Sequence, residues 1–199
     1  MIAIVDTGGA NHASIQNALL RLGHESTVTL DRNQLSQASH LILPGVGHAA
    51  HAMERIHRAE LVDFLKTQKK PLLGICLGMQ ILFGSSEEGD VECLGLLPGR
   101  VTRMQASDGF RVPHMGWSQL NTECKSTLLN GISSDAYFYF VHSYKIPKSA
   151  TTVASARAPQ VIPAVIEFDQ LYATQFHPER SGEAGAALLK NFIQIGSLP

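Results

Sequence analysis

The N-terminal part of the chain alternates short apolar runs with amphipathic stretches. Residues 2–5 are wholly apolar and mostly β-branched, which predicts a buried parallel strand. The stretch that follows carries apolar residues at helical spacing and stops at Gly23, which predicts a helix. The apolar positions of this helix are Ile15, Ala18, Leu19 and Leu22.

Two further strand-to-helix units follow. Residues 26–30 and, more strongly, residues 41–43 are predicted strands, and the second leads through a Pro-Gly-Val-Gly loop into one long helix that ends before Pro71. The apolar face of this helix is formed by Ala52, Ile56, Ala59, Val62 and Leu65. Residues 72–75 then predict a strand that turns at Cys76 into a short helix. Three such units indicate an α/β fold with a parallel sheet.

The second half has a different pattern, with alternating or aromatic segments that predict antiparallel strands. These segments cover residues 101–104, 137–141, 152–156, 164–168 and 171–176, the last two joined as a hairpin, before a final helix containing Leu188, Phe192 and Ile195. No internal repeat or linker interrupts the chain. The expected fold is therefore a single α/β domain over residues 1–199, with a mixed, largely parallel central sheet flanked by helices and additional antiparallel strands in the second half.

Composition excludes several classes of protein. The 199 residues carry 16 Lys and Arg against 17 Asp and Glu, so the net charge of -1 gives no field for binding nucleic acid or an acidic membrane. No apolar stretch approaches the roughly 18 residues of a membrane span, and no secretory signal is present. The three cysteines are odd in number and widely spaced, which argues against a disulfide framework or a metal site and favours the cytoplasm.

The segment Gly74-Ile75-Cys76-Leu77-Gly78 repeats the G-x-S-x-G pattern of a nucleophile elbow with sulfur in place of oxygen. It lies between a predicted strand and a predicted helix, where such an elbow belongs. Small neighbours permit the sharp turn, and the helix N-terminus favours a thiolate. We interpret Cys76 as a nucleophile; the alternative is a buried structural cysteine.

A thiol nucleophile needs a base and a group that orients the base. His177-Pro178-Glu179 follows a predicted strand and places an acid two residues after an imidazole. Both side chains would then lie at the carboxyl end of a strand, where open α/β sheets gather their sites. The alternative is a solvated His and Glu in an ordinary turn.

Acyl transfer also needs backbone donors for the oxyanion. The amide of Leu77 is one candidate, and the loop containing Gly45, Val46 and Gly47 is the natural source of the other. Residues 45–50 also fit a GxGxxA phosphate cradle, although no acid ends a strand about 20 residues later, since Asp63 falls within a predicted helix.

Taken together, residues 74–80, 44–47 and 175–179 resemble the class I, triad-type glutamine amidotransferases, and the resemblance spans nearly the whole chain. Within this family, residues 112–117 (Val-Pro-His-Met-Gly-Trp) and 139–144 (Tyr-Phe-Val-His-Ser-Tyr) resemble the branch that forms the ammonia-supplying glutaminase subunit of imidazole glycerol phosphate synthase in histidine biosynthesis. Two rivals remain open: the amidotransferase subunit of another synthase, making anthranilate or 4-aminobenzoate, and a nucleotide-binding regulatory module that uses the Gly45 loop.

The resemblance implies a role for each motif. Cys76 would attack the side-chain amide of glutamine, His177 would shuttle the proton, and Glu179 would orient His177. Gln80 and the backbone around His142, Ser143 and Tyr144 would hold the glutamine, while Gly45 to Gly47 would supply the second oxyanion donor. No cofactor or metal is implied. The implied partner is a (β/α)8-barrel cyclase, which uses the ammonia to make imidazole glycerol phosphate and AICAR.

The resemblance also points to a surface that would meet this partner, through Asn11, Trp117 and Arg180. Trp117 could instead pack in the core. The sequence departs from the family pattern at Thr7, where an aromatic is usual, at Ala10, where a glycine is usual, at Lys145, where a tyrosine is usual, and at Arg180, where a lysine is usual. None of these departures falls on the predicted triad.

Overall fold

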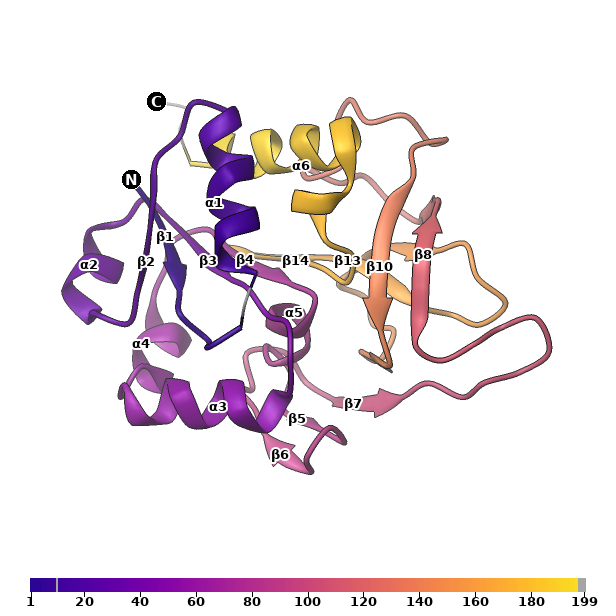
Figure 1. The fold of residues 1–199 in the computed structure, drawn as a ribbon, viewed down its shortest axis with the longest axis horizontal. Helices are drawn as coiled ribbons and strands as arrows, with labels where there is room; N and C mark the ends of the chain where they lie inside the picture. The colour runs from indigo at the N-terminus through magenta and orange to yellow at the C-terminus, as the bar shows by residue number, and fades with distance from the viewer. Residues whose placement is uncertain (10, 197–199) are drawn as a thin grey trace.

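A sheet of eight strands forms the centre of the molecule (Figure 1), whose computed structural model describes residues 1–9 and 11–196. The strand order is β2-β1-β3-β4-β14-β13-β12-β9. The first five strands of that order are parallel, and the remaining neighbours pair antiparallel. Their bounds are β1 Ile2–Val5, β2 Ser26–Thr29, β3 His40–Leu43, β4 Leu72–Ile75, β9 Leu120–Thr122, β12 Thr152–Ala156, β13 Pro163–Phe168 and β14 Leu171–Thr174. The mixed, largely parallel sheet predicted from the sequence is confirmed.

Helices cover both faces of the parallel strands, because alternate residues of each strand feed two different cores. Ile2 and Ile4 pack with the helices α1 and α6, whereas Ala3 and Val5 pack on the other face with α2, α3, α4 and α5. The helix bounds are α1 His12–Arg21, α2 Arg32–Gln37, α3 Ala49–Arg58, α4 Val62–Thr67, α5 Leu77–Gln80 and α6 Gly182–Gln194. Among the described residues, every helix is too short or too polar to cross a bilayer.

The single long helix predicted before Pro71 is wrong, because two helices, α3 and α4, occupy that stretch. Glu60 adopts a left-handed φ of 55°, the Leu61 N–H bonds the Ile56 carbonyl, and the Glu60 N–H bonds the His57 carbonyl. These bonds form a Schellman motif, which ends a helix. The apolar periodicity runs through the break because Leu61 and Leu65 stay buried, so the pattern alone gives no sign of it. As a result, Asp63 lies in the first turn of α4. Ile195 likewise falls just outside the final helix.

Two small sheets complete the fold. β10 (Phe138–His142) pairs antiparallel with β8 (His114–Ser118), and β11 (Tyr144–Lys145), β7 (Arg100–Arg103), β5 (Ser85–Ser86) and β6 (Val91–Glu92) form the other sheet. The predicted strands 101–104 and 137–141 exist, shifted by one residue. The predicted hairpin is confirmed, since β13 and β14 pair antiparallel.

The topology brings two distant segments together. β14 pairs parallel with β4, and Thr174 is the register partner of Ile75. The residues that follow these two strands, Gln175 and Cys76, therefore start side by side at one edge of the sheet. β10 runs close to the same edge (Figure 1), because the His177 N–H bonds the Tyr139 carbonyl at 2.9 Å.

Candidate active site

Cys76 lies at a strained turn between β4 and α5. Its backbone adopts φ 53° and ψ -107°, a conformation that non-glycine residues rarely adopt outside functional sites. The glycines beside it are required by close backbone approach: a Cβ on Gly78 would lie 1.7 Å from the Leu43 carbonyl oxygen, and one on Gly74 would lie 2.9 Å from the Gly78 oxygen. The sequence pattern of an elbow therefore corresponds to an elbow in the fold.

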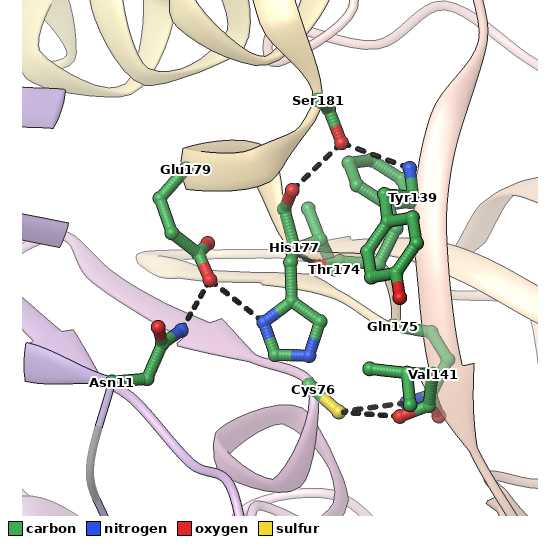
Figure 2. A network of polar contacts seen from close by, with 10 residues as sticks. Asn11, Cys76, Tyr139, Val141, Thr174, Gln175, His177, Glu179 and Ser181 are labelled. Carbon is green, nitrogen blue, oxygen red and sulfur yellow. Dashed lines mark hydrogen bonds and ion pairs between the residues drawn. The ribbon is translucent and has the colours of Figure 1, made fainter. Parts of the chain in front are cut away.

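The sulfur of Cys76 is buried beside two polar groups of opposite character. The residue is 7% exposed. Its Sγ lies 3.8 Å from the Val141 carbonyl oxygen, which can only accept, and 3.7 Å from Nε2 of Gln175, which donates (Figure 2). The thiol form can thus donate to Val141, and the thiolate form can accept from Gln175.

His177 and Glu179 form a buried pair beside this sulfur. The His177 Nδ1 lies 2.7 Å from Oε1 of Glu179, and the two side chains are 2% and 0% exposed. The turn that carries them, η1 (Pro178–Arg180), is held to β10 by Ser181, whose hydroxyl donates to the His177 carbonyl and accepts from the Tyr139 N–H. Figure 2 shows the imidazole between the carboxylate and the sulfur.

The electrostatics favour a protonated His177 when the thiol is ionised. Burial alone would lower the pKa of His177, but the Cys76 thiolate and the Glu179 carboxylate outweigh it and raise the pKa to about 10. The Nε2 atom has no hydrogen-bond partner among the described residues and faces the Cys76 sulfur (Figure 2). The arrangement can therefore move a proton between sulfur and imidazole, with the carboxylate fixing the ring.

Asn11 corrects a prediction made from the sequence. It is expected on a partner-facing surface, yet it is buried, and its Nδ2 donates to the same Glu179 oxygen that His177 contacts (Figure 2). Asparagine is a favoured N-cap residue, but at the start of α1 its side chain makes no cap and reaches across to Glu179 instead. Thr7, in the same loop, is also buried and donates to the Pro44 carbonyl at 3.2 Å. Ala10 lies outside the described residues.

A cavity of about 280 Å³ opens over Cys76. It gathers nearly all the other site residues predicted from the sequence. Its lining consists of Gly45, Val46, Gly47, Cys76, Leu77, Gln80, Glu88, Pro113, Val141, His142, Ser143 and Tyr144. Gln80 is almost fully buried and donates through Nε2 to the Tyr144 carbonyl and to Oε1 of Gln175, each at 3.0 Å. His142 is buried as well and contacts the same Tyr144 carbonyl at 2.8 Å.

Two residues of this site are absent from the sequence-based prediction. Glu88 is the only acidic or basic side chain among the lining residues, apart from the imidazole of His142. Its Oε2 accepts from the Ala49 N–H at 2.8 Å, at the start of α3. In the sequence Glu88 sits in a short polar, acidic stretch typical of a solvated loop, so nothing there marks it. Gln175 belongs to a segment used for the resemblance, but only the β4–β14 pairing shows that it reaches the sulfur.

The two proposed oxyanion donors contact each other. The Leu77 N–H donates to the Gly45 carbonyl at 3.3 Å. The loop after β3 is tight against α5, since a Cβ on Gly45 would lie 2.5 Å from the Leu77 Cβ. The Leu77 amide is therefore occupied by the loop in this state. The first amides of α3, where a phosphate would bind, are occupied: the Ala49 N–H donates to Oε2 of Glu88 at 2.8 Å and the Ala50 N–H to Nδ1 of His48 at 3.3 Å, which does not favour the phosphate-cradle interpretation.

The remaining predicted interface residues lie on the surface beside the site. Trp117 is 54% exposed and meets the half-buried Tyr139 edge-on at 5.7 Å, so the core-packing alternative is wrong. Arg180 is exposed, and Lys145 donates through Nζ to Gln160 and to the Val161 carbonyl. Within residues 1–9 and 11–196, the His, Cys, Asp and Glu side chains do not gather in threes as a metal site would require.

Comparison with known proteins agrees with this geometry. Residues 3–195 match the family model of glutamine amidotransferase class-I, so the chain belongs to the class I glutamine amidotransferase family. A solved structure described as a glutamine amidotransferase superposes with a TM-score of 0.77 at 20% identity, covering 99% of both chains.

Curated relatives are more specific. The chain is 49% identical to the imidazole glycerol phosphate synthase subunit HisH of Xanthomonas euvesicatoria pv. vesicatoria, over 98% of this chain and 97% of the relative. It is 44% identical to subunit HisH 2 of Legionella pneumophila, over 99% of both chains. The chain is therefore an enzyme of the glutamine amidotransferase type.

Proposed function

We propose that this chain is the glutaminase subunit of an imidazole glycerol phosphate synthase, hydrolysing glutamine and passing the ammonia to a (β/α)8-barrel cyclase in histidine biosynthesis. The observation that carries the proposal is the line of Cys76, His177 and Glu179 at one end of a cavity of about 280 Å³. The near-full-length similarity to HisH subunits supports the choice of synthase. Residues 1–199 act as one domain in this proposal, and three free cysteines suit the reducing cytoplasm.

The reaction begins with proton transfer from the Cys76 sulfur to Nε2 of His177. The thiolate attacks the side-chain amide carbon of glutamine and forms a tetrahedral oxyanion. His177 returns the proton to the departing nitrogen, ammonia leaves, and a thioester remains. Water, deprotonated by His177, then attacks the thioester and releases glutamate, and the sulfur regains its proton. Glu179 accepts from Nδ1 throughout and keeps Nε2 aimed at the sulfur.

The cavity walls suit the rest of the glutamine molecule. Glu88 is the one carboxylate among the residues that line the cavity, which suits the α-ammonium group of glutamine. Ser143 and Tyr144 also line the cavity. Gln80 and His142 hold the Tyr144 carbonyl in place from two sides.

We assign the oxyanion donors to the Leu77 amide and to the loop of Gly45, Val46 and Gly47. The 3.3 Å bond from the Leu77 N–H to the Gly45 carbonyl must open before Leu77 can serve an oxyanion. We therefore expect the isolated chain to be a poor glutaminase, and a loaded partner to activate it by moving this loop. One oxyanion donor contributes about 10²- to 10³-fold in rate.

The surface beside the cavity suits a protein partner. Met115, Trp117 and Tyr137 are 63%, 54% and 53% exposed, an unusual concentration of large apolar side chains on and beside the β8–β10 sheet. Aromatic residues and methionine are enriched at protein interfaces. Arg180, the exposed last residue of η1, provides a positive charge beside this surface. We propose that the cyclase docks here and receives ammonia directly from the site.

Replacement of Cys76 tests the proposal. In the assembled synthase, Cys76→Ala should abolish glutamine-dependent synthesis and leave synthesis from added ammonium salt intact, because the cyclase chemistry lies on the partner. Cys93→Ala is the matched control: burial, with a contribution from Glu88, raises the pKa of Cys93 to about 11, so it is a poor nucleophile. Retained glutaminase activity in Cys76→Ala would falsify the assignment.

The base is tested separately. His177→Asn should lose several orders of magnitude in glutamine hydrolysis, and Glu179→Gln should lose less, because it orients the base without carrying the proton. His142→Asn should retain much more activity than His177→Asn. The reverse order would mean that the base is misassigned.

A further inference from the structure

Gln175 is fully buried at the end of β14 and has no part in the mechanism given above. Its Nε2 lies 3.7 Å from the Cys76 sulfur and its Oε1 lies 3.0 Å from the Gln80 amide nitrogen. We propose that Gln175 is a catalytic residue whose side-chain N–H stabilises the Cys76 thiolate. The inference rests on the proposed function, in which that thiolate is the nucleophile.

The orientation of the Gln175 amide is determined by Gln80 and the Tyr144 carbonyl. The Tyr144 carbonyl can only accept, so the group of Gln80 that contacts it at 3.0 Å is the amide NH2. The same NH2 then faces Gln175, whose carbonyl oxygen must turn toward it. The NH2 of Gln175 is left to face the sulfur. A flipped Gln175 would oppose two NH2 groups and would present a carbonyl oxygen to the thiolate.

The Tyr144 carbonyl is itself fixed by a chain of side chains on β8 and β10. His142 contacts it through Nδ1 at 2.8 Å, the His142 Nε2 lies 3.2 Å from Nδ1 of His114, and the His114 Nε2 lies 3.3 Å from the Ser118 hydroxyl. Burial lowers the pKa of His142 to about 3 and also lowers the pKa of His114, so both rings are neutral near pH 7. Only one set of tautomers fits, with each Nδ1 carrying the proton.

The donor from Gln175 matters because a competing group favours the neutral thiol. The Val141 carbonyl, 3.8 Å from the sulfur, can accept from S–H but repels a thiolate. A hydrogen bond to the charged form of a group favours that form. Gln175 thus opposes Val141, and it does so without gaining or losing a proton itself.

Few other groups control the charge of this sulfur. The titratable side chains around it are His177 beside the sulfur, Glu179 behind His177, and His142, Tyr144 and Glu88 among the residues that line the cavity. His142 stays neutral near pH 7 and adds no charge. A change at Gln175 that leaves these groups in place should therefore appear as a change in thiolate population.

The test follows alkylation of Cys76 by iodoacetamide against pH, with labelled peptides identified by mass spectrometry in a Cys124→Ser background, since Cys124 is exposed. Gln175→Met keeps the length of the side chain and removes the donor. We expect the pH midpoint of alkylation about one unit higher than in the parent protein, and alkylation about tenfold slower at a pH below both midpoints. Gln34→Met, on the exposed face of α2, is the matched control and should behave as the parent protein.

A double-mutant cycle tests whether Gln80 orients Gln175. Gln80→Met should slow alkylation less than Gln175→Met, and the double variant should equal Gln175→Met, because Gln80 acts on the sulfur only through Gln175. With the cyclase bound, Gln175→Met should lower kcat more than it changes KM.

Parent-like alkylation by folded Gln175→Met, or additive effects in the double variant, would overturn the proposal. If Gln175→Met does not fold, Gln175→Asn carries the same expectation, because it keeps an amide but draws the N–H away from the sulfur. Iodoacetamide requires neither glutamine nor the cyclase. Failure of the proposed function therefore shows in the synthase assay, and failure of this inference shows in the alkylation profile.

Discussion

Mild acid should destabilise this protein through His142. Burial is the main cause that lowers the pKa of this ring from 6.5 to about 3 in the folded state. As the pH falls below 6.5, the unfolded chain binds a proton at His142 but the folded chain does not. The contribution of neutral His142 to the free energy of unfolding is therefore fully present above pH 6.5 and is lost as the pH falls toward 3. Between pH 7 and pH 5 the loss amounts to about 2 kcal/mol.

The geometry explains why the ring resists protonation. Its Nδ1 donates to the Tyr144 carbonyl and its Nε2 accepts from His114, so an added proton would set two N–H groups against each other. His114, whose pKa burial also lowers, acts in the same direction. His177 acts in the opposite direction, because its pKa is raised to about 10 in the folded state. Its contribution to the free energy of unfolding is fully present below pH 6.5 and is lost as the pH rises toward 10.

Urea unfolding at pH 7, 6 and 5 measures the effect, with His142→Asn as the comparison. Asparagine places an amide nitrogen close to the position of Nδ1, so it retains a donor for Tyr144 but does not titrate. The contributions of His114 and His177 are common to both proteins and largely cancel in the difference. The parent should lose about 2 kcal/mol more than His142→Asn between pH 7 and pH 5. Parallel losses in the two proteins would refute the reasoning.

Three other changes have defined outcomes. Asn11→Ala removes one of two donors to the buried Glu179 oxygen and should lower kcat for glutamine about 10- to 100-fold, with Asn17→Ala on the exposed face of α1 as a silent control in the same steady-state assay. Gly78→Ala forces a Cβ to within 1.7 Å of a carbonyl oxygen and should lower the thermal midpoint severely or prevent folding; a near-parent melting curve would contradict the close approach. Glu60→Gly relieves a left-handed φ of 55° at an exposed site and should raise stability by about 0.5–1 kcal/mol in urea unfolding, whereas a loss would mean that the helix end depends on the side chain.

The sequence by itself determined the local features of the fold and of the nucleophile. The buried runs at 2–5, 41–43 and 72–75 form strands because wholly apolar β-branched or leucine-rich segments bury both faces, and this is a property of the segment alone. The two glycines around Cys76 likewise predict a tight strand-to-helix turn, since a Cβ on Gly78 would collide with β3 and a Cβ on Gly74 with the backbone of α5. The hairpin of β13 and β14 follows from short-range turn chemistry.

Tertiary structure alone decided which distant groups meet. β14 inserts beside β4 although nearly 100 residues separate them, and this pairing places Gln175 at the sulfur of Cys76. Asn11 is a favoured helix cap in sequence, yet the packing of α1 against η1 gives its side chain a buried carboxylate to bind. Glu88 belongs to a segment that looks solvated, and it becomes a cavity wall only because the start of α3 lies against it.

The helix break at Glu60 shows the physical reason for this division. Periodicity records which side chains are buried, and burial continues across the break because α3 and α4 pack against the same face of the sheet. Periodicity does not record the direction of the backbone between α3 and α4, which depends on how the two helices pack against the sheet. Local sequence preferences determine the helices and strands. Contacts between residues far apart in the chain leave no local sequence pattern, and they determine where these elements end and which residues form the site.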